Sequence, residues 1–339
     1  MKTKFVLFFS LIIITTAILY SCKKENLEEG MTASETPLTP YTISSPNYMP
    51  QLHIPADNPL TVEGIELGRK LYYDTILSNS GISCSSCHFQ SYAFSNPTVN
   101  SLPHMNLAWN NKFLWIGSEE GVLENAMIFE VEDFFQTDIS KLNNHNSYPG
   151  LFKRVFQTTN ITAHHVAYAL AQFVRTQVSI NSKFDQYLRY ETMLTPSEMN
   201  GFVIYNSERG DCFHCHTLGL FNDNNFHNIG IDSIFAGQNK GRYNITLDST
   251  DLGKFKTPSL RNVELTAPYM HDGRFSTLEQ VVEHYNSQVK ITPSLDPILT
   301  KPNHQFGLQL NNQEKADLVA FLKTLTDTSF ITNQALSNP

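Results

Sequence analysis

Two short cysteine–histidine motifs carry most of the chemistry available to this chain. The first is Cys84-Ser85-Ser86-Cys87-His88, and the second is Cys212-Phe213-His214-Cys215-His216. In each motif the two thiols can add to the vinyl groups of a haem, and the imidazole that follows can bind its iron. The motifs therefore predict two covalently bound haem c groups, with His88 and His216 as iron ligands.

Zinc is the alternative to haem, because two CxxC pairs can supply the four thiolates of a structural zinc site. The pairs lie far apart in the chain and a histidine follows each at the same position, so the sequence favours haem. The chain has five cysteines, and only Cys22 lies outside the motifs. No pair is left for a disulfide.

The chain opens with an export signal. Lys2 and Lys4 precede an apolar stretch over residues 5–19, which is shorter than the roughly 20 residues that span a bilayer. The stretch ends in Leu19-Tyr20-Ser21-Cys22, which resembles the lipobox of bacterial lipoproteins. We expect a signal peptide over residues 1–21 and a periplasmic protein held to the membrane by a lipid on Cys22. An ordinary secretory signal or an uncleaved anchor is the alternative. Residues 22–50 are polar and predict a flexible tether.

Composition limits the class of protein and its partners. A hydrophobic content of 41% and a charged content of 17% are typical of a globular chain, and 339 residues suit two domains of about 150 residues each. The net charge is −8 and no basic stripe is present, which argues against nucleic acid as a partner. The acidic balance is compatible with a small basic electron donor. The oligomeric state stays open, with a homodimer as one option.

Helical patterns precede both motifs. One covers residues 62–73, and a second starts at Thr195-Pro196-Ser197-Glu198, which offers a cap, a proline and a glutamate in the right order. A long helix is predicted over residues 162–178 and another after Asn311. The best strand candidate is residues 227–234. The sequence therefore predicts a mainly α fold of two cytochrome c-like haem domains with long connecting loops, over residues 51–194 and 195–330.

Two blocks of sequence resemble the bacterial diheme cytochrome c peroxidases, a family that includes the MauG-like enzymes. Residues 67–74 (LGRKLYYD) match the opening of that family, and residues 256–273 (KTPSLRNVELTAPYMHDG) match a longer, more specific block. The resemblance covers residues 60–327. It implies that the N-terminal haem reacts with peroxide, that the C-terminal haem passes electrons, and that a calcium ion lies between the two domains.

The resemblance also bears on the sixth ligand of the second iron. The family's peroxidases use a methionine, but the matching position here is Tyr285, and no methionine follows Met270. MauG-like members place a tyrosine at this position, and a tyrosinate favours oxidised iron. The alternative is that Tyr285 is a core aromatic residue and that His284 or water is the ligand.

The first iron needs an open face to meet peroxide. In many members a histidine on a loop after the first motif blocks it, and His104 is the candidate here. However, residues 106–110 (NLAWN) match the family segment that follows the loop. On that alignment the loop is missing, His104 lies in a helix, and the iron is open, which is the interpretation we favour.

Further residues take roles from the resemblance alone. Trp115 matches the tryptophan that relays electrons between the haems, and a core residue is the alternative. Glu130 or Glu132, with a slight preference for Glu130, would carry a proton during O–O cleavage, and a solvated acid is the alternative for either. The calcium ligands would be Asn100 and the carbonyls of Thr266 and Pro268.

The sequence thus predicts a peroxidase that reduces hydrogen peroxide to water with electrons from a small cytochrome or cupredoxin. One alternative is a MauG-like enzyme that oxidises a protein or organic substrate. The other is a diheme electron carrier without enzymatic activity.

Overall fold

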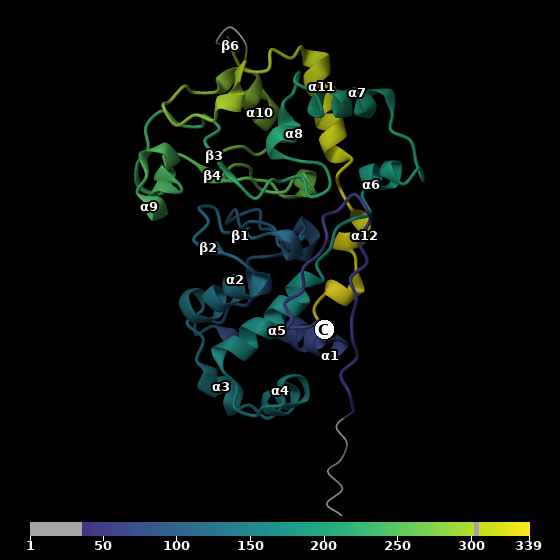
Figure 1. The fold of residues 1–339 in the computed structure, drawn as a ribbon, viewed down its shortest axis with the longest axis vertical. Helices are drawn as coiled ribbons and strands as arrows, with labels where there is room; N and C mark the ends of the chain where they lie inside the picture. Colours follow the sequence, from purple (N-terminus) through teal and green to yellow (C-terminus); the bar gives the residue numbers. More distant parts are fainter. Residues whose placement is uncertain (1–35, 302–304) are drawn as a thin grey trace, which may run out of the picture. The chain divides into compact units, whose positions relative to one another are not determined.

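The computed structural model describes residues 36–301 and 305–339 (Figure 1). The chain divides after Pro37, and Leu38–Pro339 forms one compact unit that contains all the elements described below. The predicted signal peptide and the lipid site at Cys22 lie outside the described residues.

The segment that precedes the first helix is attached to this unit. The Tyr41 N–H donates to the Leu60 carbonyl at 3.0 Å, and the Tyr48 hydroxyl donates to Asp185 at 2.9 Å. Met49 is buried. The sequence predicts a flexible tether up to residue 50, whereas Tyr41, Tyr48 and Met49 already contact the rest of the compact unit.

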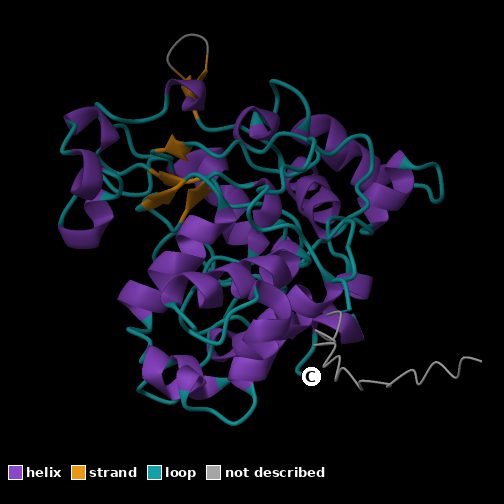
Figure 2. Cartoon of the chain, turned by 60° about the horizontal axis from the view of Figure 1, so that its bottom comes forward, coloured by secondary structure: helices purple, strands orange, loops and turns teal. Residues whose placement is uncertain are grey.

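Helices dominate the regular structure (Figure 2), which confirms the prediction of a mainly α fold. The α-helices are α1 (Val62–Tyr73), α2 (Leu123–Phe129), α3 (Ile139–Asn143), α4 (Tyr148–Phe156), α5 (Ala163–Arg175), α6 (Lys183–Leu188), α7 (Pro196–Tyr205), α8 (Cys212–Cys215), α9 (Tyr243–Thr246), α10 (Leu278–Glu283), α11 (Asn312–Lys323) and α12 (Thr328–Ile331). Two of them, α2 and α10, run on into π-helical turns, η5 (Glu130–Phe134) and η9 (His284–Gln288).

In the part of the chain that the structure describes, the strands are only two residues long and each pairs with one other strand. They form three antiparallel ribbons, made by β1 (Lys112–Phe113) with β2 (Glu119–Glu120), β3 (Phe226–His227) with β4 (Phe255–Lys256), and β5 (Thr300–Lys301) with β6 (Gln305–Phe306). The strand expected over residues 227–234 is therefore wrong beyond His227. The Asn228 side chain accepts from the Gly230 N–H at 2.9 Å, and Gly230 has φ +68°, so the chain turns there instead of continuing.

Capping side chains fix the helix starts where the sequence predicts them. The Thr195 hydroxyl accepts from the Glu198 N–H, and the Asn311 side chain accepts from the Glu314 N–H at 3.0 Å. Each glutamate reaches back to the cap residue's own N–H, which completes a capping box. The helix predicted over residues 62–73 is α1.

The long helix α5 is shorter than predicted. It follows the expected Thr162 cap but ends at Arg175, three residues before the predicted end at 178. The Gln177 carbonyl leaves the helix and accepts from the Asn106 N–H at 2.8 Å, so a tertiary contact replaces the last turn.

Two hydrophobic clusters form the core. One gathers buried side chains of α1, α2, α4 and α5, and the other gathers those of α7, α10 and α11. Phe330 and Leu336, near the C-terminus, return to the first cluster, where the ring centroid of Phe330 lies 5.6 Å from that of Phe94. The domain boundary at residue 194 stays a prediction.

Glycine permits two close helix crossings, each between a helix before a CxxCH motif and a helix after it. At Gly68 of α1, an added Cβ would lie 1.9 Å from the Ala169 carbonyl oxygen of α5. At Gly201 of α7, it would lie 1.9 Å from the Asp317 carbonyl oxygen of α11. The two halves of the unit therefore use the same device to bring a helix pair together.

Replacing Gly68 or Gly201 by Ala should lower the free energy of unfolding by about 1–3 kcal/mol, because the helices must separate. This loss outweighs the gain of ~1 kcal/mol in helix propensity. Gly150→Ala in α4 is the matched control, since nothing lies within 4 Å of its Cβ position. Denaturant unfolding should show a loss for the first two variants and none for the third. A gain in all three would contradict the crossings.

Candidate haem sites and the cavity beside the second motif

Both CxxCH motifs hold their histidine in the same way. The His88 Nδ1 lies 2.8 Å from the Phe94 carbonyl oxygen, and the His216 Nδ1 lies 2.9 Å from the Phe221 carbonyl oxygen. Phe94 and Phe221 both have left-handed backbones, with φ 59° and 56°. When Nδ1–H donates to the carbonyl, Nε2 is left as the atom of each ring that can bind a metal.

Burial keeps the ligand groups uncharged. It lowers the pKa of His88 and of His216 to about 4, so both imidazoles are neutral at neutral pH, the form that ligates a metal. Burial also raises the pKa of the Cys84 thiol well above its ordinary value and that of Cys212 to about 12.

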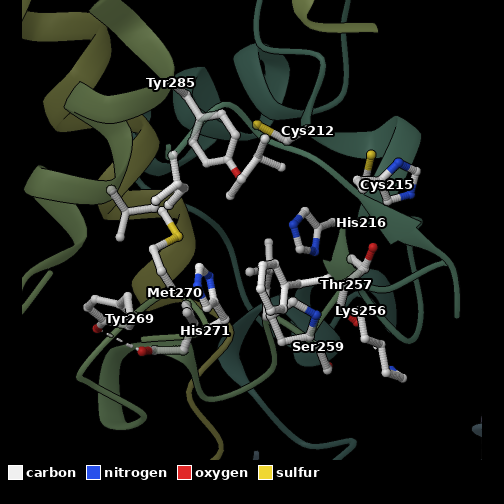
Figure 3. A pocket seen from close by; sticks show the side chains of 18 of the residues that line it. Cys212, Cys215, His216, Lys256, Thr257, Ser259, Tyr269, Met270, His271 and Tyr285 are labelled. Carbon is white, nitrogen blue, oxygen red and sulfur yellow. Dashed lines mark hydrogen bonds between the residues drawn. The ribbon is translucent and has the colours of Figure 1, made fainter. Parts of the chain in front are cut away.

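A large cavity lies beside the second motif (Figure 3). Its empty volume is about 1740 Å³, part of which is open to solvent. Cys212, Cys215 and His216 line it, and so does Tyr285 from η9. Figure 3 shows the Tyr285 hydroxyl directed into the cavity.

The three side chains that could compete as a ligand here occupy different places. Tyr285 and Met270 both line the cavity, whereas His284 does not. The His284 Nε2 lies 2.9 Å from the Ile229 carbonyl oxygen, which occupies that nitrogen. Burial raises the pKa of Tyr285, so its phenol stays protonated unless a metal displaces the proton. Ligation by Tyr285 stays a prediction, with Met270 as the rival that the structure adds.

Glu130 and Glu132 lie in very different environments. Burial raises the pKa of Glu130 to about 7. The Glu130 carboxylate in turn helps to raise the pKa of the Cys84 and Cys87 thiols, so it faces the first motif. Glu132 is exposed. The structure therefore brings only Glu130 to the first motif, and its role in proton transfer stays a prediction.

Glu130 and Tyr285 share a local structure. Glu130 is the first residue of η5 and Tyr285 the second of η9, and both turns continue an α-helix with the wider π-helical spacing. Such turns are rare and occur often at functional sites, because the extra residue redirects a side chain.

His104 lies against the first motif, but not in a helix. Its ring stacks on that of His88 with centroids 3.5 Å apart, and its Nδ1 lies 3.1 Å from the Tyr72 hydroxyl. The expectation of a helical position is wrong, because the His104 N–H donates to the Phe94 carbonyl at 3.2 Å in an irregular segment. An open iron at the first motif stays a prediction.

Trp115 lines the cavity of the second motif. Its Nε1–H donates to the Asn100 carbonyl at 3.4 Å, and its own carbonyl accepts from the Lys256 N–H at 2.8 Å. These contacts join the β1–β2 region to the segment that carries β4. They are compatible with the predicted electron relay, which stays a prediction.

The predicted calcium ligands lie in one region. Asn100, Thr266 and Pro268 all line the same cavity. The Asn100 side-chain nitrogen donates to the Met270 carbonyl at 2.8 Å, so its side-chain oxygen is the atom left for a cation. An oxygen-only set suits a hard cation such as calcium. Occupancy by calcium stays a prediction.

The residues present at the second motif fit a haem, and at the first motif the neutral His88 and the two thiols supply the groups that would hold one. At the second motif the cavity and the neutral His216 provide room and a ligand. In the half of the unit that holds the first motif, Arg175 is buried and pairs with Glu124 at 2.7 Å. Its Nε and Nη1 make no hydrogen bond within the described part of the chain. Unsatisfied buried donors are rare and indicate a missing partner in this half of the unit.

Among the residues that line the second cavity, Met270, His227 and Lys256 carry chemistry that the sequence did not single out. The His227 ring bridges Asp223 at 2.8 Å and Asp296 at 2.5 Å, and against the cost of burial its hydrogen bonds to these carboxylates raise its pKa to about 12. Lys256 and Met270 lie within residues 256–273, the block that resembles the family, but no local sequence pattern assigned them a role.

Comparisons with known proteins agree with these features. A sequence profile of the di-haem cytochrome c peroxidase family matches residues 62–193. The methylamine utilization protein MauG of Methylorubrum extorquens is 34% identical over 293 residues, covering 80% of each chain. The cytochrome c551 peroxidase of Nitrosomonas europaea is 31% identical, covering 80% of this chain and 83% of that protein. The crystal structure of a MauG-like protein associated with microbial copper homeostasis matches with a TM-score of 0.79 and 31% identity, over 88% of this chain and 99% of that one.

The fold and the two motifs thus define a c-type cytochrome with a cavity beside its second motif and a half-buried acid near its first. The chain belongs to the family of bacterial diheme cytochrome c peroxidases and MauG-like enzymes. It is an oxidoreductase, and membership implies two c-type haems. Within residues 36–301 and 305–339, no helix has both the length and the apolar character needed to cross a membrane.

Proposed function

We propose that this protein reduces hydrogen peroxide to water with electrons from a small cytochrome or cupredoxin. One observation carries the proposal, namely the asymmetry between the two motifs. The first lies near Glu130, a half-buried acid with a pKa of about 7, and the second lines a cavity to which the Tyr285 phenol also contributes. This asymmetry supports a division of labour in which peroxide reacts at the first site and electrons enter at the second.

The haem at the first motif, when bound, supplies an iron that exchanges electrons with peroxide. Glu130 accepts the proton from one peroxide oxygen and delivers it to the other, which leaves as water. A pKa near the working pH suits both steps, because the group must take the proton and then release it. With two electrons and two protons, one hydrogen peroxide becomes two water molecules.

Tyr285 specifically favours a second candidate function, a MauG-like enzyme that oxidises a protein or organic substrate. A tyrosinate stabilises oxidised iron, so the second site would share oxidising equivalents with the first instead of storing a reducing electron. Curated relatives that carry the name MauG support this candidate, and those named cytochrome c peroxidase support the first.

The remaining features of the proposal concern assembly and location. The protein has two haem domains over residues 51–194 and 195–330, with Trp115 as the relay between them. A calcium ion is held by Asn100, Thr266 and Pro268. The mature protein lies in the periplasm and is anchored by a lipid on Cys22.

Electron counting separates the two candidate functions. A stopped-flow assay with a reduced small cytochrome should show two donor molecules oxidised for each peroxide consumed. The control is the same donor and peroxide without the protein. A peroxide-oxidised state that persists beside excess reduced donor, and decays only when a protein or organic substrate is added, would overturn the peroxidase proposal in favour of the second candidate.

A further inference from the structure

Lys256 is a buried lysine among the residues that line the second cavity. Its side chain lies at the end of β4 and the residue is only 5% exposed. Figure 3 shows Lys256 on the same wall as Thr257 and Ser259. Its Nζ donates to the Thr257 carbonyl at 3.2 Å, and no carboxylate of the described residues forms an ion pair with it.

This arrangement leaves most of the ammonium's bonding capacity unused. An ammonium has three N–H donors, and only one is engaged here. Burying a charge without a counter-ion costs several kcal/mol. Burial accordingly lowers the pKa of Lys256 to about 8, and the negative charge of Asp223 opposes this only in part. A buried anion beside Lys256 would remove the imbalance.

The nearby carboxylates are already committed. Asp223 and Asp296 hold the His227 ring from both sides, at 2.8 Å and 2.5 Å. Asp223 also accepts from the Asn225 N–H at 2.9 Å. These groups form a cluster of their own, so the anion that pairs with Lys256 has to come from outside the described residues.

The cavity wall indicates which anion this is. Lys256 shares the cavity with Cys212, Cys215 and His216, the residues that attach and ligate the second haem. A haem carries two propionate groups, and each is a carboxylate when ionised. We propose that Lys256 is the counter-ion of a propionate of the second haem. The inference rests on a haem in this cavity and is independent of which substrate the enzyme oxidises.

The pair affects electron transfer. A positive charge beside a haem stabilises its reduced form and raises its reduction potential. The backbone N–H of Lys256 also donates to the Trp115 carbonyl, so Lys256 lies beside the predicted electron relay. Lys256 is thus a positioning residue. It influences the reduction potential and the position of the second haem without taking part in the chemistry.

The test compares three variants by potentiometric titration, followed in the visible spectrum at neutral pH, where the Lys256 ammonium is charged and an unpaired propionate is ionised. Lys256→Met keeps the length of the side chain and removes the charge. Lys254→Met is the matched control, because Lys254 lies two positions earlier, is partly exposed and already pairs with Asp251 at 3.1 Å. Lys256→Arg restores the charge. Covalent haem content by intact mass shows that each variant is loaded.

Lys256→Met should lower the equilibrium constant for reduction of the second haem about tenfold. For one electron, this corresponds to a fall of ~59 mV in its midpoint potential. Lys254→Met should leave the potential unchanged, and Lys256→Arg should recover most of the loss. An unchanged potential in a fully loaded Lys256→Met protein would overturn the assignment, and so would an equal shift in Lys254→Met. A loss of peroxide reduction with the potential intact would count against the assignment without touching the proposed function.

Discussion

Replacing Glu130 by Gln should slow peroxide reduction by roughly two to four orders of magnitude, the range for loss of a general acid–base group. The amide keeps the shape of the side chain but cannot carry the proton from one peroxide oxygen to the other. Stopped-flow measurement of the peroxide reaction gives the rate directly. Binding of the haems should be unaffected, which the visible spectrum checks.

Glu132→Gln is the matched control, since it makes the same chemical change two residues away on an exposed side chain. Its rate should stay within a factor of about two of the wild type, because surface changes are usually nearly neutral. Equal losses in both variants, or no loss in Glu130→Gln, would remove Glu130 from the mechanism.

The pH dependence follows from the raised pKa of Glu130. The carboxylate must accept a proton first, so kcat/KM in peroxide should fall as the pH drops below about 7, and Glu130→Gln should lack this limb. The sign for stability is opposite. The pKa of Glu130 in the folded protein is above its ordinary value of 4.5, so the protonated carboxyl contributes to the free energy of unfolding. This contribution is complete below pH 4.5 and is lost as the pH rises through about 7. Glu130→Gln should therefore resist unfolding better than the wild type in alkaline buffer.

Replacing Tyr285 by Met should raise the reduction potential of the second haem. A neutral thioether stabilises ferrous iron, whereas tyrosinate stabilises ferric iron. The expected shift is on the order of 0.1 V or more, within the ~0.8 V range over which axial ligands act. The variant should also come to depend on prior reduction before it reacts with peroxide. A redox titration followed by visible absorbance measures the shift.

Two control variants identify the ligand if it is not Tyr285. His284→Ala should leave the low-spin spectrum nearly unchanged, since the His284 Nε2 is held by the Ile229 carbonyl outside the cavity. Met270→Leu removes the thioether that shares the cavity with Tyr285. If Met270→Leu changes spectrum and potential while Tyr285→Met changes neither, Met270 is the ligand and the case for MauG-like chemistry loses its main residue.

Local sequence signals predicted the helices well. The caps at Thr195 and Asn311, and the bounds of α1, follow from short-range hydrogen bonds that depend on neighbouring residues only. The errors arose where distant segments meet. The end of α5 is set by the contact between Gln177 and Asn106, and the expected strand after His227 gives way to a turn at Asn228.

The candidate site was predictable only in part, for a similar reason. The CxxCH motifs are local and unambiguous, but the choice between Glu130 and Glu132 depends on burial, which the spacing does not reveal. The carbonyls of Phe94 and Phe221 hold the two histidines, and both residues have a left-handed backbone. The sequence does not predict this conformation, because phenylalanine rarely adopts it. Lys256 becomes a candidate only once its burial is known and the described residues are seen to offer it no ion pair.

Low-temperature EPR of the oxidised protein, before and after peroxide, tests most directly whether the two irons differ. An open first iron beside Glu130 and a second iron ligated by His216 and Tyr285 predict one high-spin and one low-spin ferric signal. Peroxide should abolish the high-spin signal. Two low-spin signals that peroxide leaves unchanged would contradict the open first site and, with it, a peroxide reaction at the first motif.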